Sequence, residues 1–423
     1  MPEGWAWCRF TSVTVNRDSE RKPISSANRT NVAKIYDYYG ASGKIDKIDK
    51  FIFNEKLLLI GEDGANLVTR SKPIAFFAEG QYWVNNHAHC IDSTDKLILE
   101  YLCLYINAIS LEKYVTGSAQ PKMTQDNMNS ILIALPPYEE QKRLEFQVNH
   151  ILKTVSTIEN EKEDIVNYIS SAKSKILDLA IRGKLVPQNP NAEPASVLLE
   201  RIRAEKEELI KAGKIKRDKK ESIIFRGEDN SYYQQTGTLI ENINDWNLDD
   251  IPINWELCCL GEICDYGNCV NVDTKDIDEE AWVLDLEDIE KDSGKVIHKI
   301  RKYERNSSST KHLFKKGQVL YSKLRPYLNK VVLADEEGFC TSEILPLNFS
   351  NVVEPQYALY YLMSPTFLKY ANRCSYGVKM PRLGTADGRK AVFPLPPFEE
   401  QRRISRHISK IFIEIDNISN MLL

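Results

Sequence analysis

The stretch that decides the fold begins Leu135-Pro136-Pro137-Tyr138-Glu139-Glu140-Gln141-Lys142-Arg143-Leu144. Proline is tolerated where a helix starts, because its missing N–H would have no intrahelical partner, and acidic residues in the first turn suit the positive end of the helix dipole. Gly183 can end such a helix in the left-handed conformation, and Pro187 prevents the helix from resuming. We therefore predict one long helix over residues 139–182.

Apolar residues recur along this helix in alternating steps of four and three, which is a heptad pattern that requires a partner helix. A second start signal, Leu395-Pro396-Pro397-Phe398-Glu399-Glu400-Gln401-Arg402-Arg403-Ile404, begins a helix over residues 398–423 with the same stepping. We predict that the two helices pair. Their expected seam contains Leu144, Val148, Ile151, Val155 and Ile158 of the first helix and Ile404, Ile408, Ile411, Ile415 and Ile418 of the second.

The repeated start signal belongs to a larger internal repeat. Pro2-Glu3-Gly4-Trp5 matches Pro252-Ile253-Asn254-Trp255, and Gln120-Pro121-Lys122-Met123 matches Met380-Pro381-Arg382-Leu383. Both ends of a domain therefore occur twice, each time before a helix, whereas the interiors of the two copies differ. We predict an α+β protein with a first domain at residues 1–138, a central region at 139–240, a second domain at 241–397 and a final helix at 398–423. Two domains with matching ends and different middle parts suggest two versions of the same function. We call the matching ends the frame.

Composition narrows the class of protein. The chain has 423 residues, 42% hydrophobic and 27% charged, which is typical of globular proteins with two or three domains. No apolar run approaches 18 residues and no signal peptide precedes the first domain, so we expect a cytoplasmic protein without a membrane partner. Its nine cysteines are then most simply free thiols. Because the formal net charge is −4, any DNA binding must depend on local basic patches.

In the first domain we expect a buried strand at residues 56–60 and a helix at 97–111. The loop at 117–125 combines small residues, amides, hydroxyls and one lysine, which suits close approach to a phosphate backbone or to base edges. Its candidate DNA-binding residues are Ser118, Gln120 and Lys122, and a plain surface turn is the alternative. His87 and His89 could bind a metal, but no carboxylate or cysteine at zinc spacing supports such a site.

The central region continues with a predicted helix at 195–212 and then, from 221 to 250, a polar stretch without periodicity that we interpret as a linker. In the second domain the segment 255–264 is expected to be a strand. Four cysteines, Cys258, Cys259, Cys264 and Cys269, lie close in sequence but lack the C-x-x-C spacing of a zinc site. We therefore predict no bound metal.

The most informative segment of the second domain is Gln318–Lys330, where an apolar strand runs into a basic and aromatic loop. Side chains of this kind reach phosphates and base edges. Candidate DNA-binding residues are Lys323, Arg325 and Asn329 in this segment, and Lys379 and Arg382 near the end of the domain. Structural ion pairs could explain any one of the charged residues, but not easily all of them.

The two PPxEEQ-R helix starts, the ending Leu179-Ala180-Ile181-Arg182-Gly183-Lys184-Leu185-Val186-Pro187 and the paired domains resemble the specificity subunit of type I restriction-modification systems. The resemblance covers essentially the whole chain. It implies two mixed α/β target recognition domains, each reading one half of a bipartite, asymmetric double-stranded DNA site, and long helices that form an antiparallel coiled coil. Two features depart from the family pattern: no helix precedes the first domain, and the last helix lacks a counterpart of the 180–187 ending.

The resemblance further implies that two methyltransferase subunits, which methylate adenine N6, and restriction translocase-nuclease subunits assemble on this scaffold. S-adenosylmethionine, ATP and magnesium would belong to those partners, and no cofactor to this chain. The alternative is a fused or degenerate DNA-modifying enzyme, since Pro136-Pro137-Tyr138 resembles the end of the Asn-Pro-Pro-Tyr motif of adenine methyltransferases. Leu135 and Leu395 cannot replace the Asn, whose side-chain oxygen accepts from the flipped base. A purely structural adaptor would not need two divergent domains. We therefore expect no catalytic residue in this chain.

Overall fold

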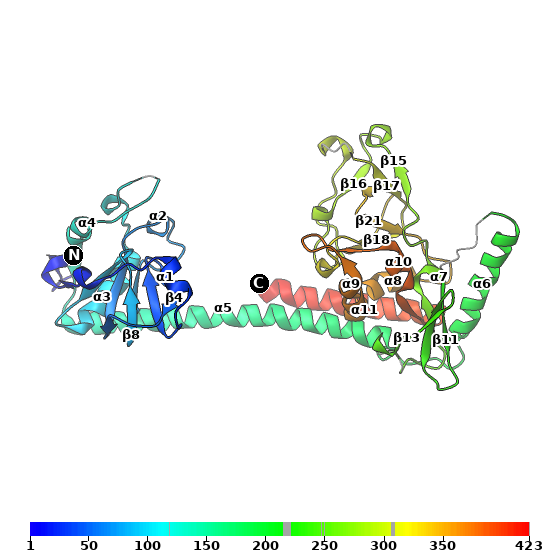
Figure 1. Cartoon of the computed structure of the whole chain (residues 1–423), viewed down its shortest axis with the longest axis horizontal. Helices are drawn as coiled ribbons and strands as arrows, with labels where there is room; N and C mark the ends of the chain where they lie inside the picture. The colour runs from blue at the N-terminus through cyan, green and yellow to red at the C-terminus, as the bar shows by residue number, and fades with distance from the viewer. Residues whose placement is uncertain (118, 215–220, 247, 249, 306–308, 423) are drawn as a thin grey trace. The chain divides into compact units, whose positions relative to one another are not determined.

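The computed structural model describes residues 1–117, 119–214, 221–246, 248, 250–305 and 309–422. The chain divides into two compact units, Met1–Asn160 (unit 1) and Glu161–Leu423 (unit 2), which are described separately. Both units combine helices with small mixed sheets, so the expected α+β class is confirmed (Figure 1).

In the part of unit 1 that the structure describes, the strands form three small sheets. Their strand orders are β2-β9-β6-β7, β4-β3-β8-β5 and β1-β10. The strands are β1 (Ala6–Arg9), β2 (Val15–Asn16), β3 (Tyr36–Gly40), β4 (Gly43–Ile48), β5 (Phe53–Asn54), β6 (Leu57–Gly61), β7 (Ala75–Ala78), β8 (Gln81–Val84), β9 (Ala88–Asp92) and β10 (Leu132–Leu135). All five residues of β6 are buried, as the apolar run at 56–60 predicted.

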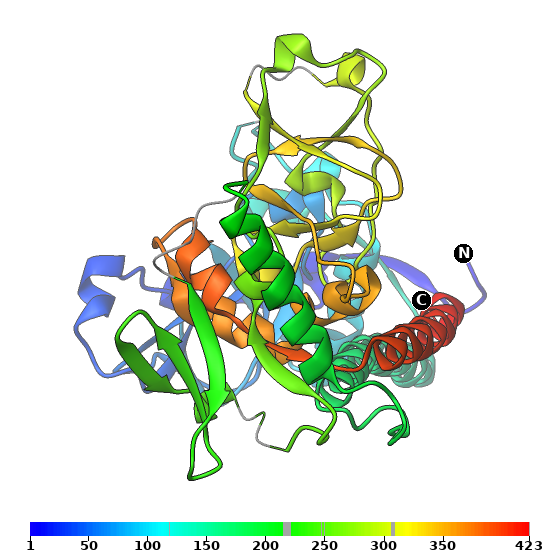
Figure 2. The same cartoon turned by 90° about the vertical axis from the view of Figure 1, so that its right-hand side faces the viewer.

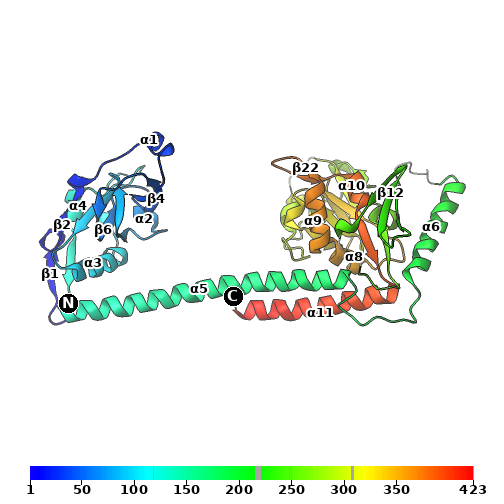
Figure 3. The ribbon, with the colours of Figure 1, turned by 60° about the horizontal axis from the view of Figure 1, so that its bottom comes forward.

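The helices of unit 1 are α1 (Ser26–Thr30), α2 (Asn66–Thr69), α3 (Lys96–Ala108), α4 (Gln125–Asn129) and the first part of α5 (Tyr138–Ile181). Asp95 caps the start of α3 by accepting from the Leu97 amide, and α3 buries Leu99, Leu102 and Ile106 in the main core. Figure 3 shows α3 between the strands and the start of α5. The hydroxyl of Tyr101 donates to the carbonyl of Ala134, which fixes α3 against β10.

The described residues of unit 2 form five small sheets, ordered β15-β17-β20-β16, β19-β18-β21, β14-β24, β22-β23 and β11-β12-β13. The strands are β11 (Ser222–Arg226), β12 (Tyr232–Thr236), β13 (Leu239–Asn242), β14 (Glu256–Cys259), β15 (Val270–Val272), β16 (Trp282–Leu284), β17 (Lys311–Phe314), β18 (Val319–Ser322), β19 (Val331–Leu333), β20 (Gly338–Thr341), β21 (Ile344–Leu347), β22 (Ser375–Tyr376), β23 (Arg382–Leu383) and β24 (Val392–Leu395).

The helices of unit 2, after the second part of α5, are α6 (Ala195–Lys211), α7 (Leu260–Ile263), α8 (Pro355–Leu362), α9 (Pro365–Cys374), α10 (Thr385–Lys390) and α11 (Phe398–Leu422). One large core joins α5, α6, α8 and α11 to β14, β18 and β24. A smaller core is centred on Trp282, Phe314 and Cys340. The bounds of α6 confirm the predicted second helix of the central region.

The interpretation of residues 221–250 as a linker is wrong. Residues 222–242 form the antiparallel sheet β11-β12-β13, which lies next to α6 (Figure 2). The strands are rich in Ile, Phe, Tyr and Thr, which favour extended backbone, and the turns contain Asn230 and Gly237 at positive φ. The predicted strand at 255–264 is likewise shorter, because β14 ends at Cys259 and α7 follows at once.

The ends of the sequence repeat adopt the same structure in both units. In unit 1, β1 pairs antiparallel with β10, and Ala6 lies opposite Leu135. In unit 2, β14 pairs antiparallel with β24, and Glu256 lies opposite Leu395. In each case the second strand of the pair leads through two prolines into a long helix. The predicted duplication of the frame is therefore confirmed.

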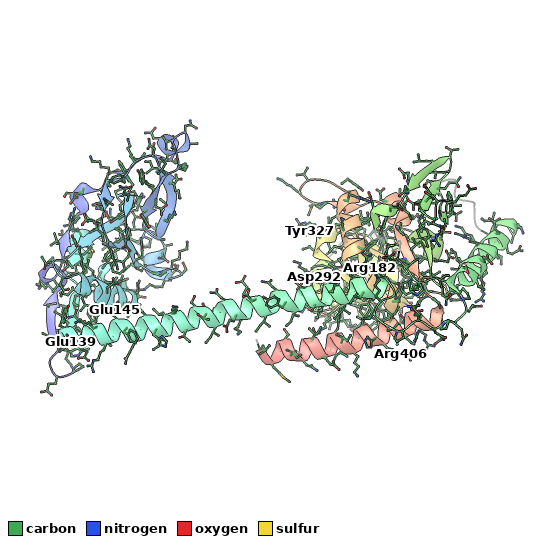
Figure 4. The ribbon with its side chains drawn as sticks, turned by 90° about the horizontal axis from the view of Figure 1, so that it is seen from below. Glu139, Glu145, Arg182, Asp292, Tyr327 and Arg406 are labelled. Atoms are coloured by element: carbon green, nitrogen blue, oxygen red, sulfur yellow. The ribbon has the colours of Figure 1, made fainter. Side chains whose placement is uncertain are left out.

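The paired part of the long helices lies in unit 2. α5 ends as predicted, with Gly183 at φ +67°, and α11 runs antiparallel to its second part (Figures 1 and 4). Near one end of the pair Gln188 donates to Glu400 at 2.6 Å, and near the other Lys173 contacts Asp416. Figure 4 labels Arg182, which directly follows α5, and Arg406 of α11 in this region.

The ten seam residues have different environments. Ile404 and Ile408 are buried, Ile411 and Ile415 are half-buried, and Ile418 is exposed. In unit 1, Leu144 packs against the main core, and it lines an apolar groove with Val148, Leu152 and α3. Ile151, Val155 and Ile158 are 59%, 45% and 52% exposed, within a stretch, 149–161, in which every residue is exposed. α11 therefore covers the second part of α5, and these three residues lie outside the paired part.

Candidate nucleic-acid interface

Each unit has a site where three loops meet beside the central strands. Junction 1 consists of residues 62–64 after β6, His87 before β9, and the loop 116–123 as far as the structure describes it. Junction 2 consists of residues 323–325 after β18, Glu343 before β21, and the hairpin 376–383. These segments contain six of the eight candidate DNA-binding residues.

The two junctions share their backbone hydrogen bonds. The amide of Gly64 donates to the carbonyl of Pro121 at 2.9 Å, and in the same way the amide of Arg325 donates to the carbonyl of Pro381 at 2.7 Å. The amide of Met123 donates to the backbone carbonyl of Glu62 at 2.7 Å, and the amide of Leu383 donates to the backbone carbonyl of Lys323 at 3.0 Å. The amide of Glu62 donates to the backbone carbonyl of His87 at 2.9 Å, and the amide of Lys323 donates to the backbone carbonyl of Glu343 at 3.0 Å.

The loop itself also closes in the same way in both units. Thr116 pairs with Lys122 in an isolated bridge, and Tyr376 pairs with Arg382 between β22 and β23. A glycine at positive φ, Gly117 or Gly377, follows the first residue of each pair. The frame thus presents two structurally equivalent loops, and the side chains on them differ.

Junction 1 carries a mixed set of charges. Lys122, half-exposed, forms an ion pair with Glu62 at 3.1 Å, and Arg21 reaches the other oxygen of Glu62 at 2.7 Å. Although burial raises the pKa of the Glu62 carboxyl, the hydrogen bond from Arg21 and the charge of His89 lower it below its usual value. His87 bonds through Nδ1 to Asp63 at 2.7 Å and is 46% exposed.

A buried cluster supports junction 1 from behind. His89 is 1% exposed, and its Nδ1 lies 2.6 Å from Asp18 while its Nε2 lies 3.0 Å from the carbonyl of Met123. Both ring nitrogens face oxygen acceptors, which a doubly protonated ring satisfies. Asp18 also accepts from the Cys90 amide at 2.7 Å. His89 and His87 are thus hydrogen-bonding residues that hold loops.

Junction 2 is organised around Arg382. Its Nε lies 3.1 Å from each carboxylate oxygen of Glu343, its Nη2 lies 2.8 Å from Oε1, and its Nη1 donates to the carbonyl of Met380 at 3.2 Å. The side chains of Arg382 and Glu343 are 35% and 23% exposed. A bidentate arginine–carboxylate pair fixes both position and orientation.

Arg325 lies in the left-handed region, at φ +49°, where the equivalent residue of junction 1 is Gly64 at φ +104°. This conformation is unfavourable for a residue with a Cβ atom, so the backbone of Arg325 is strained. The Nε of Arg325 is buried and has no hydrogen-bond partner among the described residues. Strained residues with unsatisfied polar atoms concentrate at functional sites.

The candidate residues divide as follows. Gln120, Lys122 and Lys379 are exposed, and Lys323, Arg325 and Arg382 are half-buried, all at the junctions. Ser118 lies outside the described residues. Asn329 differs: it is 8% exposed, and its Nδ2 donates to the carbonyl of Met363 at 3.2 Å, so it holds the loop to α8 from within. Tyr327, labelled in Figure 4, is the exposed residue of that turn, at 48%.

Sequence reasoning missed the carboxylates Glu62 and Glu343 and the buried pair Asp18–His89. No local motif marks these residues, because their partners are distant in sequence. The repeat of Lys122 as Arg382 was the one available signal that both loops need a basic residue at this position.

Among the described residues, no group of three or more His, Cys, Asp or Glu side chains could hold a metal ion. Cys258 and Cys259 are buried free thiols, and burial raises the pKa of Cys258 well above its usual value. None of the described helices combines the length and the apolar character that crossing a membrane requires.

Comparison with known proteins identifies the family to which the two repeated segments belong. Residues 2–171 and 252–422 match the family described as type I restriction modification DNA specificity domain. The chain belongs to this family. The two matched segments each contain one copy of the duplicated frame and one junction. The chain is a DNA specificity protein. In a type I restriction-modification enzyme, catalysis is carried by other subunits.

Individual relatives agree with this assignment. The chain is similar to the Type I restriction enzyme EcoDI specificity subunit of Escherichia coli, with 21% identity over 400 residues, covering 92% of this chain and 77% of that protein. It is 30% identical over 272 residues to the EcoEI specificity subunit of the same organism, covering 62% and 42% of the two chains. A solved chain from a study of assembly and conformational transition of the type I R-M system shares the fold, with a TM-score of 0.50, 16% identity, and coverage of 100% of this chain and 93% of that one.

Proposed function

We propose that each unit of this specificity protein reads one half of a bipartite, asymmetric double-stranded DNA site through its junction. The observation that carries the proposal is the set of three equivalent backbone hydrogen bonds that place a basic residue, Lys122 or Arg382, on the same loop of both units. The frame is the same in both copies, but the residues on it differ, as a pair of readers for two different half-sites requires.

The junctions contain the groups that DNA recognition uses. Lys122, Lys323, Arg325, Lys379 and Arg382 offer donors to phosphate oxygens and base edges, and the amide of Gln120 offers both a donor and an acceptor. Because the protein has a net charge of −4, contact between DNA and its whole surface is unfavourable. DNA binding would therefore depend on these local groups. We further propose that α5 and α11 set the spacing between the half-sites.

Two methyltransferase subunits and restriction translocase-nuclease subunits would assemble on the helices in the cytoplasm. S-adenosylmethionine, ATP and magnesium would be bound by those partners, since the sequence contains neither a glycine-rich phosphate-binding motif nor the Pro-Asp and Glu-x-Lys motif of a nuclease. The exposed apolar residues of α5 between 149 and 161 are available surface for such assembly.

The alternative, a DNA-modifying enzyme built on Pro136-Pro137-Tyr138, is not favoured. The carbonyl of Pro136 accepts from Nε2 of Gln141 at 2.9 Å, and the ring of Pro137 packs against Gly4. These prolines form a joint between strand and helix, and the same joint recurs at Pro396.

The direct test is selection from a random library of DNA duplexes by the purified full chain, followed by sequencing of the bound fraction. We expect two short conserved blocks separated by a spacer of fixed length and free sequence. Binding without any sequence preference, at low and at moderate salt, would contradict the proposal.

A further inference from the structure

The guanidinium of Arg382 is held through all three of its nitrogens. Arginine has five N–H donors in a planar fork. Nε and Nη2 donate to Glu343, and Nη1 donates to the carbonyl of Met380. These contacts use one N–H on each of the three nitrogens.

One N–H on Nη1 and one on Nη2 are not used by these contacts. An arginine with two donors left can bind two adjacent acceptors, such as O6 and N7 of guanine in the major groove or two oxygens of a phosphate. Because Glu343 and Met380 hold the guanidinium, its orientation is set before any ligand arrives, and little side-chain freedom would be lost on binding.

The charge of the pair favours a base over a phosphate. Arg382 with Glu343 carries no net charge, so it gains little from the electrostatic attraction that dominates phosphate contacts. Its directional hydrogen bonds are retained. Junction 1 contrasts with this arrangement, because Lys122 is a point charge whose three rotatable donors do not form a fork.

About a third of the Arg382 side chain is exposed, at 35%. The hairpin between β22 and β23 that carries it is itself exposed, with Val378 at 101%, Tyr376 at 64% and Met380 at 47%. Arg325 donates its amide to Pro381 of the same hairpin, so the backbone on which Arg382 sits is fixed at its base.

We propose that Arg382 is the residue of unit 2 that reads a guanine in the major groove, and that Glu343 is a positioning residue that orients its guanidinium. This inference rests on the proposed DNA-reading function and adds to it one residue, one base and one orienting partner. Junction 1, with lysine at the equivalent place, lacks this contact, so the two half-sites differ in kind.

The test compares the full chain with three variants, Arg382→Lys, Glu343→Gln and Arg382→Lys with Glu343→Gln, by selection from a random duplex library. Arg402→Lys is the matched control, because Arg402 forms an exposed ion pair with Glu399 on α11, at 3.3 Å. Thermal unfolding of each variant measures folding separately.

The wild-type chain should select a G·C pair at one position in one half-site. Arg382→Lys should lower the preference for that pair roughly tenfold or more, since a bidentate contact discriminates strongly against other bases. Glu343→Gln should weaken the same preference several-fold at that position alone, and the double variant should lose no more than Arg382→Lys. Arg402→Lys should leave the selected sequence unchanged.

Three results would overturn the inference. A folded Arg382→Lys variant with unchanged preference excludes the base contact. A uniform loss of affinity for all sequences, with a smaller salt slope, shows a phosphate contact instead. Lowered melting temperatures with intact preference in both single variants show a merely structural ion pair. If the wild-type chain selects no sequence at all, the proposed function fails, and this inference with it.

Discussion

Nε2 of Gln401 donates to the carbonyl of Pro396 at 2.9 Å, and this bond closes the turn between β24 and α11. Gln141 makes the same bond, at 2.9 Å, to Pro136 at the start of α5. Trp5 reaches the neighbouring Glu140 through Nε1 at 3.1 Å, which ties the first strand of the frame to the helix. The PPxEEQ motif is therefore a joint: the prolines stop the strand, the glutamine secures the turn, and the helix leaves in a fixed direction.

We expect Gln401→Leu to lower the free energy of unfolding of unit 2 by about 3 kcal/mol, because it leaves several buried groups without partners. Gln401 is fully buried, donates also to Val352 at 3.0 Å, and accepts from the amide of Glu354 at 2.8 Å. Urea denaturation followed by tryptophan fluorescence measures the change. Arg402→Ala, one residue further on an exposed position, should stay within about 0.5 kcal/mol. A loss below about 1 kcal/mol for Gln401→Leu would show that the joint is not a source of stability.

The buried pair Asp18–His89 should make the stability of unit 1 depend on acid. Burial raises the pKa of Asp18, but the hydrogen bond and charge of His89 and the charge of Arg21 lower it below its usual value. Since the folded pKa is lower than the unfolded value of about 3.9, Asp18 contributes stability above that pH, and this is lost as pH falls through the folded pKa.

Asp18→Asn should accordingly lower the unfolding free energy at pH 7 by about 3 kcal/mol and reduce its decline between pH 5 and pH 2. Urea denaturation at a series of pH values checks both effects. Asp63→Asn is the control, since its partner His87 is exposed and that pair should contribute less than about 1 kcal/mol. Equal effects of the two substitutions would refute a special role for the buried cluster.

Arg325→Gly should separate stability from DNA binding. Glycine adopts the left-handed conformation freely, so the unfolding free energy of unit 2 should stay constant or rise by about 1 kcal/mol. DNA affinity should fall, with a salt slope smaller by about one if Arg325 contacts a phosphate, or with relaxed preference at one position if it contacts a base. Asn329→Gly, at φ +48° in the same turn but buried, should lower stability and leave sequence preference intact. Undiminished DNA binding by Arg325→Gly would remove Arg325 from the interface.

Inserting one heptad into the exposed stretch 149–160 of α5 should lengthen the unread spacer by about three base pairs, since each residue adds 1.5 Å and each base pair 3.4 Å. Both half-sites should be preserved. Sequencing of selected duplexes reads the spacer directly. An unchanged spacer in a folded variant would mean that α5 does not set the distance.

The sequence predicted those parts of the fold that depend on local chemistry. The starts of α5 and α11 and the end of α5 at Gly183 follow from motifs whose residues contact near neighbours. The duplicated frame pairs strands that are distant in sequence, and it was predicted because its end motifs occur twice. The sheet of residues 222–242 was missed because β12 has two aromatic residues, Tyr232 and Tyr233, followed by two polar ones, Gln234 and Gln235, and so lacks the alternation that indicates a strand.

The junctions could be predicted only in part. Lys122 and Arg382 were found because they repeat, whereas Glu62 and Glu343 hold these residues from other loops and have no matching signal. Asn329 was misplaced because a polar residue in a basic loop suggests exposure, but its side chain instead bonds to the backbone beside α8. Which polar residues of a loop turn inward depends on partners that only folding brings together.

The most direct test of the central claim, that the units are independent readers, replaces residues 1–134 with the corresponding domain of another family member. The joints at Pro136 and Pro396 are kept. Sequences bound by the folded chimera are then selected from a random duplex library and compared with those of the wild-type chain. We predict that one half of the bipartite site changes, while the other half stays the same. A change in both halves, or in neither, would contradict the account.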